Sequence, residues 1–101
     1  MKFEEKQIRV EYNNVSYLDE GSTDLVTIIC IHGFPFNKET WENQIDAWKD
    51  DYRVIAYDVR GHGKSTADTS QSTITRFAND LLLFMDALGV ETAVLCGLSM
   101  G

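Results

Sequence analysis

Residues 92–101 read TAVLCGLSMG, a short apolar run that leads directly into the pattern G-x-S-x-G at 97–101. A strand that turns sharply into a helix holds its apex residue in strained geometry, and larger side chains two positions away would crowd the turn. Gly97 and Gly101 remove that crowding and place the hydroxyl of Ser99 clear of the backbone. The stretch predicts Ser99 as a nucleophile, while the motif alone leaves a glycine-rich strand end with a solvated serine as the alternative.

Two earlier runs, 25–31 and 52–57, are predicted to be buried strands. The first is almost continuously apolar and rich in β-branched residues, which is typical of a strand buried on both faces of a sheet. Apolar spacing predicts helices over 38–49 and 74–88, between these runs and the last one. Strands that alternate with helices imply a parallel sheet with right-handed crossovers. Chemistry in such sheets gathers in the loops at the carboxyl ends of the strands.

Both predicted helices carry an apolar stripe and a signal at one end. Trp41, Ile45 and Trp48 form the first stripe, and Asn37 is the expected N-cap. Gly89 is expected to close the second helix. The stripe of that second helix consists of Ile74, Phe77, Leu81, Phe84, Met85 and Leu88.

The first part of the chain alternates between apolar and polar residues over 7–12, and the alternation resumes at Val15 and Tyr17. Asn13 and Asn14 lie between the two stretches, and asparagine tolerates the positive φ of a tight turn. The sequence therefore predicts an antiparallel hairpin with its turn at these two asparagines, followed by β-α-β-α-β, in a single α/β domain over 1–101.

A second loop, HGFP at 32–35, follows the first long apolar run. Acyl transfer requires two N–H donors aimed at the tetrahedral oxyanion, and the expected donors are the backbone N–H groups of Phe34 and Met100. Gly33 lets the backbone approach closely, and an ordinary turn is the alternative. His32 suits an orienting, hydrogen-bonding role beside this loop better than the role of general base.

A third loop, DVRGHGKS at 58–65, follows the second run, and with 32–35 and 97–101 it completes a set of three motifs. In this order and spacing the motifs resemble those of the α/β-hydrolase family, as does Trp41 in the first helix. The resemblance implies that 1–101 form the N-terminal part of one α/β-hydrolase domain, truncated at the nucleophile elbow. It also implies that 58–65 supports the active-site loops, with Asp58 and Arg60 able to pair.

A serine nucleophile also requires a histidine and a carboxylate. The resemblance implies that the acid follows a later strand and that the histidine lies near the end of the domain, so neither belongs to 1–101. On the same ground, the alternative in which Asp58 is the acid and His62 is the base is disfavoured. The chain by itself is therefore expected to be inactive, and an incomplete sequence is favoured over a naturally short protein.

The expected activity is hydrolysis of a carboxylic ester, lactone or similar small-molecule acyl substrate. Esterases, enol-lactonases and cofactor-free haloperoxidase-like esterases are the subgroups that the chain resembles most, and carbon–carbon bond hydrolases remain open. Ser99 argues against the dehalogenase branch, which uses an aspartate. The alternative class is a non-catalytic fragment or a binding protein on the hydrolase scaffold. The proposed chemistry needs no metal and no organic cofactor.

Composition narrows the partners and the location. A net charge of −7 argues against binding to nucleic acid or to anionic membrane surfaces. The first residues lack the apolar region of a secretory signal, and no apolar run reaches the length of a membrane span, so a cytoplasmic location is expected. Cys30 and Cys96 are expected to be buried, reduced thiols. The rest of the hydrolase domain is expected to cover the open edge of the last strand.

Overall fold

The computed structural model describes residues 3–11, 13–33, 36–59, 65 and 74–98. No helix within these ranges is long and apolar enough to cross a lipid bilayer. The elements, in chain order, are β1 (Lys6–Val10), β2 (Asn13–Glu20), β3 (Thr27–Ile31), the 3-10 helix η1 (Lys38–Trp41), α1 (Glu42–Trp48), β4 (Arg53–Tyr57), α2 (Ile74–Leu88) and β5 (Val94–Gly97).

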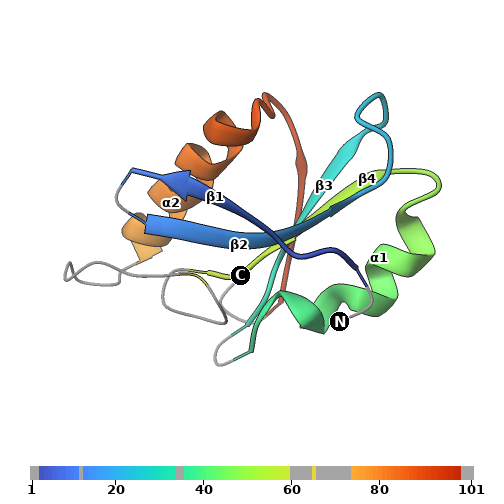
Figure 1. Cartoon of the computed structure of the whole chain (residues 1–101), viewed down its shortest axis with the longest axis horizontal. Helices are drawn as coiled ribbons and strands as arrows, with labels where there is room; N and C mark the ends of the chain where they lie inside the picture. The colour runs from blue at the N-terminus through green and yellow to red at the C-terminus, as the bar shows by residue number, and fades with distance from the viewer. Residues whose placement is uncertain (1–2, 12, 34–35, 60–64, 66–73, 99–101) are drawn as a thin grey trace.

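The strands form one sheet in the order β1-β2-β4-β3-β5 (Figure 1). The pairs β1–β2 and β2–β4 are antiparallel, whereas β3 pairs in parallel with both β4 and β5. The carboxyl ends of β3, β4 and β5 therefore meet at the same edge of the sheet. The predicted order, a hairpin followed by β-α-β-α-β, is confirmed.

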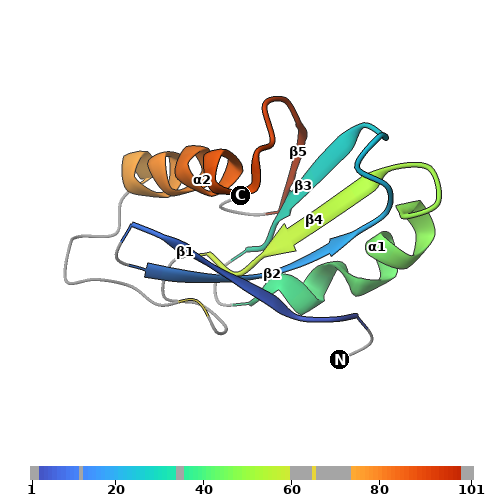
Figure 2. The same ribbon diagram turned by 45° about the horizontal axis from the view of Figure 1, so that its top comes forward.

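The central strands are buried on both faces because a helix packs on each side of the sheet (Figure 2). Val54 and Ala56 of β4 lie in one core cluster with Ile45 of α1, while Ile55 and Tyr57 lie in the other with Phe84 of α2. The Phe84 ring lies 4.9 Å from that of Tyr57, measured between centroids. Alternate residues thus face alternate helices, which explains why the apolar runs in the sequence are continuous rather than alternating.

The predicted helix over 38–49 consists of two elements, η1 and α1. Asn37 caps it as predicted, since its side-chain oxygen accepts a hydrogen bond of 2.9 Å from the N–H of Glu39. The predicted helix over 74–88 has the observed bounds of α2. Gly89 follows it with a φ of +73°, and the N–H of Val90 donates to the carbonyl of Met85 at 2.9 Å, which together form a Schellman motif.

The predicted turn of the hairpin is wrong. Val10 pairs with Asn13, so both asparagines belong to β2 and the turn begins at Glu11, which has a φ of +55°. The reason lies in the register, because this turn places Val15 opposite Ile8. A turn at 13–14 would instead set Ile8 opposite Asp19, whose carboxylate binds Arg53.

Candidate active site

Two of the three predicted loops begin side by side at the carboxyl edge of the sheet, where β3 and β4 end. His32 and Gly33 follow β3, and Asp58 and Val59 follow β4. The third begins after β5, where Gly97 pairs with Ile31. The N–H of Leu98 then donates to the carbonyl of Ile31 at 3.1 Å, which extends the pairing by one residue toward Ser99.

Several predicted site residues lie outside the described ranges: Phe34, Arg60, Ser99, Met100 and Gly101. The roles given to them in catalysis and in binding the oxyanion therefore stay predictions. The proposed pairing of Asp58 with Arg60 lies outside the described residues for the same reason. His32, Gly33, Asp58 and Gly97 are described, and the site is built from these four residues.

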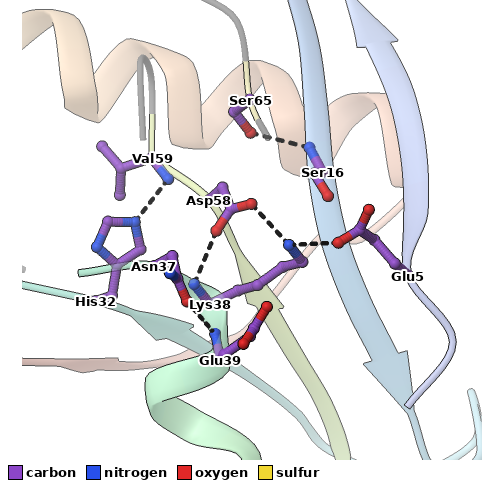
Figure 3. A network of polar contacts seen from close by, with 9 residues as sticks. All are labelled: Glu5, Ser16, His32, Asn37, Lys38, Glu39, Asp58, Val59 and Ser65. Carbon is purple, nitrogen blue, oxygen red and sulfur yellow. Dashed lines mark hydrogen bonds and ion pairs between the residues drawn. The ribbon is translucent and has the colours of Figure 1, made fainter. Parts of the chain in front are cut away.

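His32 is fully buried and holds the two loops together (Figure 3). Its Nε2 accepts a hydrogen bond of 2.9 Å from the N–H of Val59 and therefore carries no proton. The neutral ring then has its proton on Nδ1, which donates to the carbonyl of Gly33 at 3.0 Å. Both ring nitrogens are engaged with backbone, which is the geometry of a histidine that orients a loop.

The loop after β3 carries a further backbone hydrogen bond. The carbonyl of Gly33 also accepts a hydrogen bond of 2.8 Å from the N–H of Phe36, which spans residues 33–36. Asn37 follows as the cap of η1. The short connection between β3 and η1 therefore has hydrogen bonds at its start, across its middle and at its end.

Asp58 is buried, and both of its carboxylate oxygens accept hydrogen bonds from Lys38. Oδ1 accepts from the backbone N–H at 2.8 Å, and Oδ2 accepts from the ammonium at 2.7 Å. The same ammonium lies 2.8 Å from Oε2 of Glu5 (Figure 3). A buried carboxylate requires such compensation, because burial without a partner would strongly disfavour its charged form.

The segment 58–65 is tied to β2 at both of its ends. The N–H of Asp58 donates to the carbonyl of Ser16 at 2.8 Å, and the N–H of Ser16 donates to Oγ of Ser65 at 2.9 Å. Ser16 is fully buried and Ser65 is nearly so. One residue of β2 therefore fixes where this loop begins and where it returns to the sheet.

Sequence reasoning missed Lys38 and Glu5. A lysine in the first turn of a helix is ordinarily a solvated side chain, and it lies twenty residues from Asp58 in the sequence. The useful signal was Asp58 itself, which follows four buried residues of β4, so its carboxylate needs a compensating partner. Only the parallel pairing of β3 with β4 shows that the cation comes from the segment after β3.

Cys30 and Cys96 are register partners on β3 and β5, and both are free thiols. Burial raises the pKa of the Cys30 thiol to about 12, with a smaller contribution from Cys96. Cys30 is therefore a poor nucleophile at neutral pH. Within the described ranges, no group of three or more histidine, cysteine or carboxylate side chains is arranged to hold a metal ion.

The chain belongs to the alpha/beta hydrolase fold family, whose family model matches residues 26–101. It is 33% identical over 87 residues to 3-oxoadipate enol-lactonase 2 of Acinetobacter baylyi, covering 86% of this chain and 33% of that protein. Identity to the non-heme chloroperoxidase of Streptomyces lividans is 35%, over 87% of this chain and 32% of the relative. The enol-lactonase of Burkholderia xenovorans superposes with a TM-score of 0.88 at 31% identity, covering 94% and 37% of the two chains.

This chain spans about a third of the length of each of these relatives. The family and the fold that the sequence predicted are confirmed.

Proposed function

We propose that the protein carrying this chain is a serine hydrolase that acts on a carboxylic ester, lactone or similar acyl substrate. The observation that carries the proposal is the position of the G-x-S-x-G motif, which begins at the end of β5, at the same edge of the sheet as the loops after β3 and β4. Buried hydrogen bonds hold those two loops together. Support also comes from the relatives, whose names include an enol-lactonase and a chloroperoxidase.

In the proposed mechanism, Oγ of Ser99 attacks the acyl carbon while a general base takes its proton. The backbone N–H groups of Phe34 and Met100 donate to the oxyanion of the tetrahedral intermediate, which collapses as the protonated base gives its proton to the departing alcohol oxygen. Water then attacks the acyl-serine and releases the carboxylic acid. The base is a histidine oriented by a carboxylate, and both are supplied by parts of the protein outside 1–101. On this proposal the chain alone is inactive.

We also propose that further segments of the protein cover β5. Val94 and Leu95 are 55% and 54% exposed, although each belongs to a strand that pairs with the buried β3. Apolar side chains on both faces of one strand are typical of a strand covered from both sides. The same segments would bring the histidine and the carboxylate of the triad.

The test begins with the coding sequence beyond the Gly101 codon, followed by expression of the whole protein. A fluorophosphonate probe should label wild type covalently and should fail to label Ser99→Ala. Aryl-ester hydrolysis should fall at least about 10³-fold in that variant, since its nucleophile is gone. Ser22→Ala is the matched control, because Ser22 is exposed and lies in the loop between β2 and β3, away from the site.

Two results would contradict the proposal. One is undiminished labelling of Ser99→Ala, which would place the nucleophile elsewhere. The other is a whole protein that neither labels nor hydrolyses any ester or lactone of a broad panel, which would favour a binding protein on the hydrolase scaffold.

A further inference from the structure

Lys38 is almost completely buried, since only 1% of its surface is exposed. Its ammonium lies between two carboxylates, 2.7 Å from Oδ2 of Asp58 and 2.8 Å from Oε2 of Glu5 (Figure 3). Three separate segments meet at this one charge: the residues before β1, the start of η1 and the loop after β4. Lys38 belongs to none of the motifs that the proposed function uses.

Stability alone is a weak reason for such a cluster. Taking Lys38 and Asp58 out of water, and Glu5 in part, is costly, and well-packed apolar residues of similar size often stabilise a protein as much. Charged groups differ from apolar ones in a second way, because they require defined partner positions and hydrogen-bond directions. The cluster is therefore better understood by what it holds in place.

The position of Lys38 along the chain shows what it holds. Segment 32–38 is bound at its start by His32, whose Nε2 accepts from the N–H of Val59, and at its end by Lys38, which binds Asp58. Asp58 and Val59 are consecutive residues at the end of β4. Two adjacent residues of one loop thus hold both ends of another.

We propose that Lys38 is a positioning residue for the oxyanion-binding segment: through Asp58 it fixes the far end of 32–38, which carries the N–H of Phe34. The inference rests on the proposed function, in which that N–H donates to the oxyanion. Lys38 contacts no reacting atom and acts only through the segment that it holds. The hydrogen bonds within the segment hold it to itself and to η1, whereas His32 and Lys38 tie its two ends to the loop after β4 and so set its orientation.

The N–H donor must be placed accurately, and a second attachment of segment 32–38 improves that placement. An oxyanion donor acts at about 2.7–3.1 Å from the developing charge, and a displacement of about 1 Å can cost about 10²-fold in rate. The ammonium also remains charged at physiological pH. Burial lowers the pKa of Lys38, but its hydrogen bonds and charge interactions with Asp58 and Glu5 raise it above the ordinary value.

The experiment uses the whole protein and three variants. Lys38→Met removes the ammonium while keeping an unbranched stem of similar length. The double variant Lys38→Met/Asp58→Asn also removes the uncompensated carboxylate, and its asparagine oxygen can still accept from the backbone N–H of residue 38. Lys49→Met is the matched control, because that lysine is partly exposed and lies 4.0 Å from Asp46 on the helix surface.

Three measurements are made on each protein. Hydrogen exchange reports the opening of the amides of 33–38. Hydrolysis of an aryl ester, normalised to titrated active sites, gives kcat and KM for correctly folded enzyme. An aryl trifluoromethyl ketone, which forms a tetrahedral adduct with the serine, reports the strength of oxyanion binding.

In the double variant we expect faster exchange confined to 33–38, a kcat lower by about 10- to 100-fold and a KM within about threefold of wild type. The affinity for the ketone should fall in proportion to kcat. Lys38→Met should show the same pattern wherever it folds, and Lys49→Met should match wild type.

Wild-type exchange and kcat in the double variant would overturn the proposal. Faster exchange with unchanged kcat and ketone affinity would also overturn it, because the segment would then be held without positioning the donor. Failure of the proposed function is distinguishable, since a wild-type protein that the fluorophosphonate does not label contradicts the hydrolase itself. Hydrogen exchange would then decide on its own whether Lys38 fixes the segment.

Discussion

The two ends of β4 carry the same kind of ion pair in two different settings. At the amino end, Arg53 binds Asp19 of β2 through two hydrogen bonds of 3.0 and 2.7 Å, and both side chains keep some exposure. At the carboxyl end, Asp58 binds Lys38, and both side chains are buried. The first pair joins strands whose backbones are already paired, because Asp19 lies opposite Ile55 in the sheet. The second joins two loops that no strand pairing aligns.

This difference separates support for the sheet from support for the site. Backbone hydrogen bonds fix the register of β2 and β4, so the Arg53–Asp19 pair adds to a geometry that is already determined. At the carboxyl edge the backbone pairing ends within one residue of the strands, with the N–H groups of Asp58 and Leu98. Side chains must therefore hold much of the loops that follow. That edge is where the chemistry of parallel sheets is located. We therefore expect substitutions at the amino end of β4 to affect stability alone, whereas substitutions at the carboxyl end should affect both stability and kcat.

The largest expected effect is that of Lys38→Met on stability. Removing the ammonium leaves the carboxylate of Asp58 buried without its cation, and breaking a buried pair in this way costs about 3–5 kcal/mol. Denaturant unfolding of the whole protein measures the loss, with Lys49→Met expected within about 0.5 kcal/mol of wild type. A loss no larger than that of Arg53→Met would mean that the buried pair contributes no more to stability than the partly exposed one.

The fold was predictable because its signals are local or periodic. The continuous apolar runs, the stripe of α2 and the cap at Gly89 each determine an element without reference to the rest of the chain. The hairpin turn was not predictable in this way. Asn13 and Asn14 are good turn residues, but the register is decided by which side chains face each other across the strands, and Ile8 faces Val15.

The site was predictable only in part, for a related reason. Backbone requirements mark the sequence, so the loops at 32–35, 58–65 and 97–101 could be found from their glycines and their positions after apolar runs. A charged partner that comes from a distant segment leaves no such mark. Nothing in the sequence around Lys38 distinguishes it from a surface lysine. Only the packing of η1 against β4 shows that it is buried.

Arg53→Met at the other end of β4 should have a smaller effect. The pair is bidentate but keeps some exposure, so its loss should cost about 1–2 kcal/mol. Unfolding measured beside Lys38→Met gives the ranking directly. The variant should keep the wild-type kcat, because no part of the proposed site depends on Arg53. A fall in kcat comparable to that of Lys38→Met would remove the distinction between the two ends.

The difference in unfolding free energy between wild type and Lys38→Met should itself depend on pH, which gives a finer comparison. The pKa of Lys38 is raised in the folded state, so its contribution is fully present below the unfolded pKa of about 10.4 and is lost as the pH rises through the folded value. We expect a constant difference in unfolding free energy from pH 6 to 9, narrowing by up to about 1 kcal/mol near pH 11.

Other groups that ionise at alkaline pH do not disturb this comparison. Burial raises the pKa of Tyr17 and of Tyr57, but both are present in wild type and in the variant, so their effects cancel in the difference. Narrowing that begins below pH 9 would contradict a raised pKa for Lys38 and would show that the ammonium is poorly compensated.

The smallest expected effect concerns reactivity rather than stability, and it extends the comparison to the strand beside β4. Cys30 is fully buried, and burial raises the pKa of its thiol to about 12. Only about one molecule in 10⁴ would then carry the thiolate at pH 8, which is the form that reacts with iodoacetamide. In the native protein, alkylation of Cys30 should therefore be at least about 100-fold slower than in urea, as measured by mass spectrometry of the modified peptide. Rapid native alkylation would show that the carboxyl half of β3 opens to solvent, and the buried setting on which the Lys38–Asp58 pair depends would then be open as well.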